Sequence, residues 1–166
     1  MGVNGKQKGN NFERKIANML SARFEPVTGI KQAFSRNPDS GSFWGATNQK
    51  RIETHNLEFA NFGDLLCPKN FLYSIECKHY KTAPSLQAIM LQKVAQWDEW
   101  IKQCTQDAKN ASKKPALIVK YNNVNEIVFL QDLYVGMSPI INYQGFYVHL
   151  LETFLEQDNS IFFESH

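Results

Sequence analysis

The segment spanning residues 62–78 constrains the fold most strongly. It contains two apolar runs of strand length, 62–66 and 71–78, joined by the connection Cys67-Pro68-Lys69-Asn70. Short hydrophobic runs separated by a Pro-Asn connection predict two strands in a hairpin. Because successive side chains of a strand alternate between faces, Glu76 and Lys78 should share one face of the second strand.

The predicted hairpin would bring Asp64 back toward Glu76 and Lys78. Two carboxylates and one ammonium at the edge of a sheet are costly to bury unless a cation binds there. The cluster therefore suggests a divalent-metal site. The alternative is a carboxylate pair on the surface, neutralised by the lysine.

The composition bounds the class of protein. A chain of 166 residues with 43% hydrophobic residues and a mean hydropathy of −0.41 predicts one soluble domain with a sizeable core. No apolar run approaches the roughly 20 residues that span a bilayer, and the first eleven residues are polar, so we expect a cytoplasmic protein without a membrane partner. The three cysteines lack CxxC spacing and are interpreted as reduced packing residues, which disfavours a zinc site.

The net charge of +2 conceals an asymmetry. Residues 1–120 contain all 18 Lys and Arg but only 10 of the 16 Asp and Glu, which gives them a net charge of +8. Residues 121–166 contain no Lys or Arg and 6 acidic residues. This segregation suggests that one part of the molecule meets a polyanion, although scattered surface charge is the simpler alternative.

A helix is expected over residues 10–24, preceded by a flexible basic lead over 1–9. Its apolar residues recur at helical spacing, and Glu13 falls at the margin of the apolar face. The carboxylate of Glu13 should therefore look toward the body of the protein. The alternative is that Glu13, three residues after Asn10, only caps the helix.

The remaining elements are less regular. Residues 43–61 form a long polar connection to which we assign no role. In chain order, the other expected elements are a strand at 27–34, a turn at 35–42, a helix from Ser85 to about residue 110 with an inner stripe from Leu86 to Ala108, strands at 116–121 and 126–130, a helix at 145–157 and an apolar tail at 161–163 that docks onto the body or onto a second copy.

The order of these elements resembles the PD-(D/E)xK nuclease superfamily. Glu13 lies in the first helix, Asp64 ends one strand, and Glu76-Cys77-Lys78 lies in the next, before a helix and another strand. More narrowly, the start Lys8-Gly9-x-x-Phe12-Glu13-Arg14 and the loop Arg36-x-x-x-Ser40-Gly41 resemble archaeal and phage Holliday junction resolvases.

Two departures from the family pattern stand out. The resemblance covers roughly residues 6–121. In the first departure, Gly63 precedes Asp64 where the family has proline, a change that we expect to be harmless. Asp64 follows Glu13 by 51 positions, a long separation which implies that residues 43–61 are an insertion.

The resemblance implies an α/β fold of the restriction-endonuclease-like type, a mixed central sheet flanked by helices. We expect a single domain over residues 1–166, with a core at about 10–131 and a C-terminal extension at 132–166 that serves packing or dimerisation.

The resemblance further implies a Mg²⁺-dependent DNA endonuclease, with Mn²⁺ able to substitute. Glu13, Asp64, Glu76 and Lys78 would be catalytic. Asp64, Glu76 and the backbone carbonyl of Cys77 would bind the metal, with Glu13 contributing through water or a second ion. Lys78 would stabilise the pentacovalent phosphate or orient the attacking water.

Basic and polar side chains near these positions are candidates for binding the DNA backbone. They are Lys8, Arg14, Arg36, Ser40 and Lys81. The expected function is that of a homodimeric Holliday junction resolvase, located in the host cytoplasm if a phage encodes it. The alternatives are another structure-selective or end-processing nuclease of the same fold, a non-catalytic nucleic-acid-binding module, and an interaction protein that docks through residues 122–166.

Overall fold

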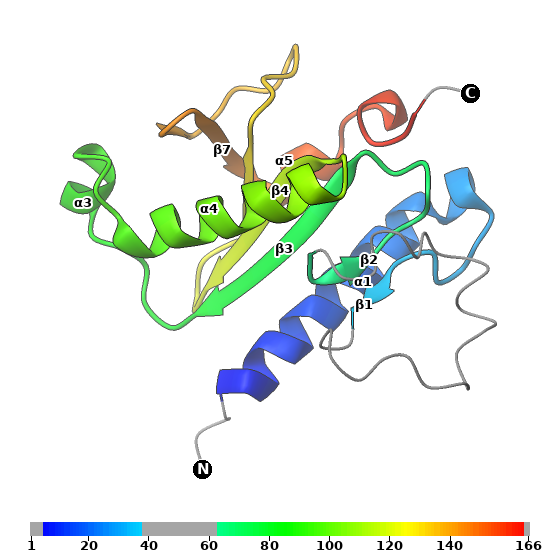
Figure 1. Ribbon diagram of the computed structural model, residues 1–166, viewed down its shortest axis with the longest axis horizontal. Helices are drawn as coiled ribbons and strands as arrows, with labels where there is room; N and C mark the ends of the chain where they lie inside the picture. Colours follow the sequence, from blue (N-terminus) through cyan, green and yellow to red (C-terminus); the bar gives the residue numbers. More distant parts are fainter. Residues whose placement is uncertain (1–4, 38–62, 165–166) are drawn as a thin grey trace.

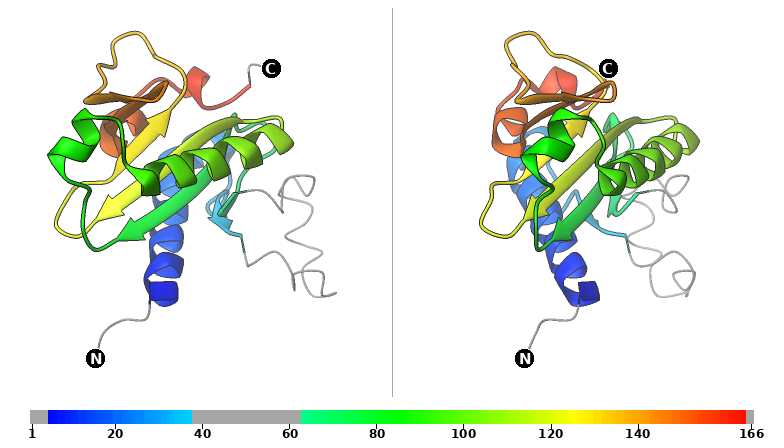
Figure 2. Two further views of the ribbon diagram at one scale, coloured as in Figure 1. Left: turned by 60° about the vertical axis from the view of Figure 1, so that its left-hand side comes forward. Right: turned by 90° about the vertical axis from the view of Figure 1, so that its left-hand side faces the viewer.

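The structure is a computed structural model that describes residues 5–37 and 63–164 (Figure 1). A five-stranded sheet forms its centre, with helices on both faces (Figure 2). This arrangement confirms the expected α/β class with a mixed sheet flanked by helices. None of the helices described is both long and apolar enough to cross a membrane.

The central sheet has the strand order β3-β4-β5-β7-β6, so β3 lies at one edge. The strands β3 and β4 are parallel, and the other pairs are antiparallel. The strands are β3 (Tyr73–Tyr80), β4 (Lys114–Tyr121), β5 (Ile127–Leu130), β6 (Ile141–Tyr143) and β7 (Phe146–Leu150). The predicted strands at 116–121 and 126–130 are confirmed as β4 and most of β5.

The first helix, α1, spans Gly5–Thr28 and packs on one face of the sheet. Its buried side chains include Phe12, Ile16 and Phe24 at the expected helical spacing. The flexible lead was wrong for residues 5–9, which belong to α1. The strand predicted at 27–34 was also wrong, because α1 continues through Thr28 before β1 begins.

The other face of the sheet is covered by α4, which spans Ala95–Asn110 (Figure 2). Trp97 and Cys104 are buried there, as predicted. The helix expected from Ser85 to residue 110 is divided, because Gln92 adopts a positive φ of 51° between α3 (Leu86–Met90) and α4. No residue of α3 is buried, so the expected inner stripe was wrong for Leu86 and Met90.

The hairpin expected between residues 62–66 and 71–78 was wrong as a strand ladder. The strand β2 (Leu65–Leu66) pairs antiparallel with β1 (Ser35–Arg36) in a separate two-stranded sheet. Residues before β3 pair with the end of the chain instead: Phe71 bridges Phe163, and the N–H of Leu72 donates to the carbonyl of Phe162. The C-terminal segment therefore pairs with the residues before β3, whereas Asp64 bonds Ile75 of β3 itself.

Residues 132–164 complete the sheet and its core. The helix predicted at 145–157 was wrong in its first part, which is β7, while α5 covers only Leu151–Leu155. Gln144 and Gly145 both have positive φ between the paired strands β6 and β7, which is the conformation of a tight hairpin turn. Phe162 is fully buried against Phe24, so the apolar tail docks onto the body.

Candidate metal and nucleic-acid site

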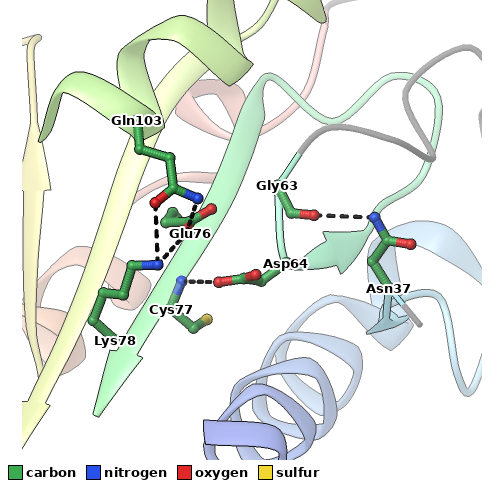
Figure 3. A network of polar contacts seen from close by, with 7 residues as sticks. All are labelled: Asn37, Gly63, Asp64, Glu76, Cys77, Lys78 and Gln103. Atoms are coloured by element: carbon green, nitrogen blue, oxygen red, sulfur yellow. Dashed lines mark hydrogen bonds and ion pairs between the residues drawn. The ribbon is translucent and has the colours of Figure 1, made fainter. Parts of the chain in front are cut away.

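Asp64 lies beside β3, at the edge of the sheet. Its backbone N–H donates to the carbonyl of Ile75 at 2.8 Å, and its Oδ2 accepts the backbone N–H of Cys77 at 2.7 Å (Figure 3). Gly63 precedes it with φ of +75°, and a Cβ there would lie 2.8 Å from the same Ile75 carbonyl. The chain thus approaches β3 closely enough to place the Asp64 carboxylate against its backbone.

Glu76 and Lys78 share one face of β3, as the strand alternation predicted. This face is the one that α4 covers. Lys78 Nζ is 2.6 Å from Oε1 of Glu76, whose side chain is only 2% exposed. Gln103 of α4 donates from Nε2 to the same Glu76 oxygen at 2.9 Å and accepts from Lys78 Nζ at 3.4 Å (Figure 3). One amide therefore contacts both members of the ion pair.

The carboxylates sit in an environment that opposes their ionisation. Burial, and then the charge of Glu76, raises the pKa of Asp64 from 3.8 to about 7, although the Cys77 N–H and Lys78 oppose this rise. Burial also raises the pKa of Glu76, with Lys78 acting in the opposite direction. Burial acts to lower the pKa of Lys78, but Glu76 and Asp64 outweigh it and raise that pKa, so Lys78 stays protonated at neutral pH.

Glu13 lies on α1, near enough for its charge to raise the pKa of both Asp64 and Glu76. Its Oε2 accepts Arg36 Nε at 2.5 Å, and Arg36 Nη2 donates to Asn10 Oδ1 at 3.0 Å. The alternative of a helix cap was wrong, because α1 begins at Gly5 and Glu13 lies inside it, where Arg36 of β1 holds its carboxylate. Its carboxylate looks toward the body of the protein, as expected from its place on the helix.

The donor set fits a hard divalent cation. Asp64 and Glu76 supply carboxylate oxygens, and Lys78 is the cation that neutralises part of their charge. The N–H of Cys77 points to the open edge of β3; in a strand the carbonyl of the same residue points the same way. Within residues 5–37 and 63–164 no three His, Cys, Asp or Glu side chains are grouped as a metal site, so backbone and water oxygens would have to complete the shell.

A cavity of about 640 Å³ opens next to these groups. It is lined by Glu13, Cys77 and Lys78, and by the start of α1 and the end of β3. Lys8 and Lys81 also line it, and Lys8 Nζ donates to Asn122 Oδ1 at 2.7 Å.

The other predicted phosphate contacts are placed differently. Arg14 is exposed on α1, whereas Arg36 is engaged by Glu13 and Asn10. Ser40 and the connection 43–61 lie outside the described residues.

Sequence reasoning placed the site at the edge of a sheet but missed two contributors, Gln103 and Asn10. Gln103 lies on the face of α4 that is turned toward β3. The sequence alone gives no reason to choose it over Gln106. Asn10 was considered only as the first residue of a capping motif that Glu13, three positions later, would complete.

Comparison with known proteins gives two findings. The model of the family described as "phage putative PDDEXK endonuclease" matches residues 4–159. Among solved structures, the chain is similar to Hjc, a Holliday junction resolvase from the archaeal hyperthermophile Archaeoglobus fulgidus, with 12% identity, a TM-score of 0.38, and coverage of 94% of this chain and 95% of that one. No curated protein matches the chain.

Proposed function

Because the chain belongs to the phage PDDEXK endonuclease family, we propose that it is a metal-dependent DNA endonuclease that resolves four-way junctions as a homodimer. The observation that carries the proposal is the meeting of Asp64, Glu76 and Lys78 at the edge of β3. These three residues come from the two segments that resemble the PD and (D/E)xK motifs, with Gly63 in place of the proline. Their convergence is a tertiary feature that an incidental motif match would not produce.

Asp64, Glu76 and the carbonyl of Cys77 would hold Mg²⁺, with Glu13 contributing through water and Mn²⁺ able to substitute. When bound, such an ion supplies a nucleophilic water near neutral pH and a counter-charge for the phosphate. Asp64 suits this role because it is already restrained by the Cys77 N–H and carries a poorly compensated charge.

Besides the metal ion, the ammonium of Lys78 supplies positive charge at the site. Its ammonium is held at 2.6 Å from Glu76 and stays protonated, so it can stabilise developing negative charge on a phosphate or orient the attacking water. The Gln103 amide restrains both side chains. The protein thus presents a cation fixed in place before the substrate arrives.

Lys8, Arg14, Arg36, Ser40 and Lys81 are proposed to contact the DNA backbone. Lys8 and Lys81 have the strongest support, because they line the same cavity as Glu13 and Lys78. Arg36 would share its guanidinium between Glu13 and a phosphate. Such contacts give affinity without reading sequence, so binding should weaken as salt is raised.

Junction specificity and dimerisation belong to the same proposal. A four-way junction has two strands to cut, and two copies of the site related by a two-fold axis would supply paired nicks. We place the enzyme in the cytoplasm, which is the host cytoplasm if a phage encodes it.

The decisive experiment compares cleavage of a four-way junction, a flap and a linear duplex of matched sequence, with Mg²⁺ and then Mn²⁺. The control is Asp64→Asn, which keeps the side-chain shape but removes the charge. We expect paired nicks in the junction by the wild-type protein and none by the variant.

The result distinguishes the alternatives. Cutting of the linear duplex as fast as the junction would leave a nuclease of this family but overturn the resolvase assignment. A wild-type protein that binds junctions and remains inert with both metals would be a binding module. Sedimentation of the wild-type protein, with and without junction, tests the dimer.

A further inference from the structure

Tyr80 is an aromatic side chain on the same face of β3 as the ion pair. Residues two apart along a strand share a face, so Glu76, Lys78 and Tyr80 form one row. Tyr80 is 44% exposed and lines the 640 Å³ cavity together with Glu13 and Lys78. A partly exposed aromatic residue therefore lines the same cavity as Glu13 and Lys78.

The ring of Tyr80 is supported from behind. Trp100 of α4 is 4% exposed, and its ring centroid lies 4.8 Å from that of Tyr80 with the planes tilted by 46°. Trp100 itself belongs to the core cluster beneath α4. The indole thus restrains one side of the tyrosine ring while the rest stays accessible to solvent.

We propose that Tyr80 is a stacking platform for an unpaired base close to the scissile phosphate. This inference rests on the proposed function and refines its substrate class: DNA that exposes an unpaired base beside the cleaved bond. A base within a regular duplex is stacked between its neighbours and has no free face for Tyr80. Branch points and single strands offer bases that can stack on an aromatic side chain.

The spacing along β3 supports this assignment. Tyr80 is two residues beyond Lys78, which at about 3.3 Å per residue is a separation of about 7 Å. That distance is about twice the 3.4 Å rise per nucleotide of a stacked strand. A base one or two nucleotides from a phosphate at Lys78 can therefore reach Tyr80.

The surrounding charge favours the same occupant. Lys78 and Lys81 bracket Tyr80 in the chain, and Lys8 lines the cavity across from them. Alternating cations and an aromatic ring suit a single nucleic-acid strand, whose phosphates and bases alternate in the same way.

A purely structural role for Tyr80, covering Trp100, is the competing explanation. Two variants separate the roles. Tyr80→Phe keeps the ring over Trp100, whereas Tyr80→Leu keeps an apolar cover but removes the aromatic face. Thermal unfolding of both variants reports whether the cover is retained.

The test measures binding of two fluorescently labelled 12-nucleotide strands to protein that carries Asp64→Asn, so that neither strand is cut. One strand is oligo-thymidine and the other is an abasic strand of equal length and charge. We expect the thymidine strand to bind roughly ten-fold tighter, within the range that stacking on one aromatic side chain provides. The preference should persist in Tyr80→Phe and disappear in folded Tyr80→Leu.

Equal binding of the two strands, or a preference that survives Tyr80→Leu, would overturn the platform. The nuclease assignment is judged separately, by metal-dependent cleavage with the wild-type protein. Cleavage without a base preference refutes only the platform, and a Tyr80-dependent preference without cleavage refutes only the nuclease.

Discussion

The carboxylate of Asp64 is bonded to the backbone N–H of Cys77, at 2.7 Å, across two segments that do not pair as strands. The contact joins the candidate metal ligand to the strand that carries Glu76 and Lys78. It also fixes Asp64 at the edge of the sheet, on the side of β3 away from β4. The position of the site therefore depends on the edge of a sheet rather than on a hairpin.

Replacing Asp64 by asparagine should stabilise the metal-free protein at alkaline pH. The pKa of Asp64 is about 7 in the folded state, against 3.8 for a free side chain. Between these values the folded state keeps a proton that the unfolded state releases, so stability falls as pH rises toward 7. Asp64→Asn removes that loss. In thermal unfolding with EDTA, the variant should have a higher Tm than the wild type at pH 8, and the difference in Tm should disappear near pH 4.

The matched control is Asp132→Asn, since Asp132 is an exposed carboxylate paired with Lys114. It should give no gain at pH 8. Added Mg²⁺ should raise the Tm of the wild-type protein more than that of Asp64→Asn. A difference in Tm between Asp64→Asn and the wild type that does not change with pH would show that Asp64 is not the titrating group.

Lys78→Met should abolish cleavage and also weaken the fold. The substitution leaves the buried carboxylate of Glu76 without its cation, a loss of about 3 kcal/mol for a buried pair broken on one side. Adding Glu76→Gln should restore much of the free energy of unfolding but no activity. Urea unfolding and junction cleavage measure the two effects, and additive losses of stability would contradict a coupled pair.

Gln103→Leu should lower the cleavage rate with little change in Tm. The exposed amide contacts both Glu76 and Lys78, so its loss frees the ion pair to move while leaving the core intact. We expect a fall in kcat of about ten-fold, the effect of losing one aligned contact of about 1.4 kcal/mol. Gln106→Leu is the control, because its amide bonds Asn110 instead; equal effects from both would point to a change in α4.

Gly63→Pro should inactivate the protein, although proline stands at this position in the wider family pattern. Proline fixes φ near −65°, whereas Gly63 has φ of +75°. Gly63→Ala should also be harmful, because a Cβ would lie 2.8 Å from the Ile75 carbonyl that binds the Asp64 N–H. Cleavage assays and Tm values check both variants, and full activity of Gly63→Pro would contradict the observed close approach.

Phe162→Ala should destabilise the monomer fold by about 3–5 kcal/mol, the usual cost of deleting a buried phenyl ring. Phe162 is fully buried among Phe24, Tyr73 and Phe154. Urea unfolding at two protein concentrations measures the loss, with Val135→Ala as a solvent-exposed control. A loss that depends strongly on protein concentration would indicate that the tail stabilises a dimer instead.

Local sequence patterns predicted the helices and strands whose apolar side chains form a continuous buried face. The core positions of α1, α4 and β4 followed from periodicity, and so did the shared face of Glu76 and Lys78. Patterns failed where the chain changes direction without a strong breaker, as at Gln92, whose positive φ divides the expected long helix. They also failed at residues 145–150, where Gln144-Gly145 forms a turn that sequence reasoning did not use.

The sequence alone determined the chemistry of the site: two carboxylates, a lysine, a helical glutamate and their order in the chain, which together indicated the nuclease family. Tertiary structure decided how they meet. The backbone of Phe162 and Phe163 pairs with Phe71 and Leu72, β2 pairs with β1, and Asp64 bonds Ile75 and Cys77 of the edge strand β3. Such pairing joins residues far apart in the chain, and periodicity within short windows carries no information about it.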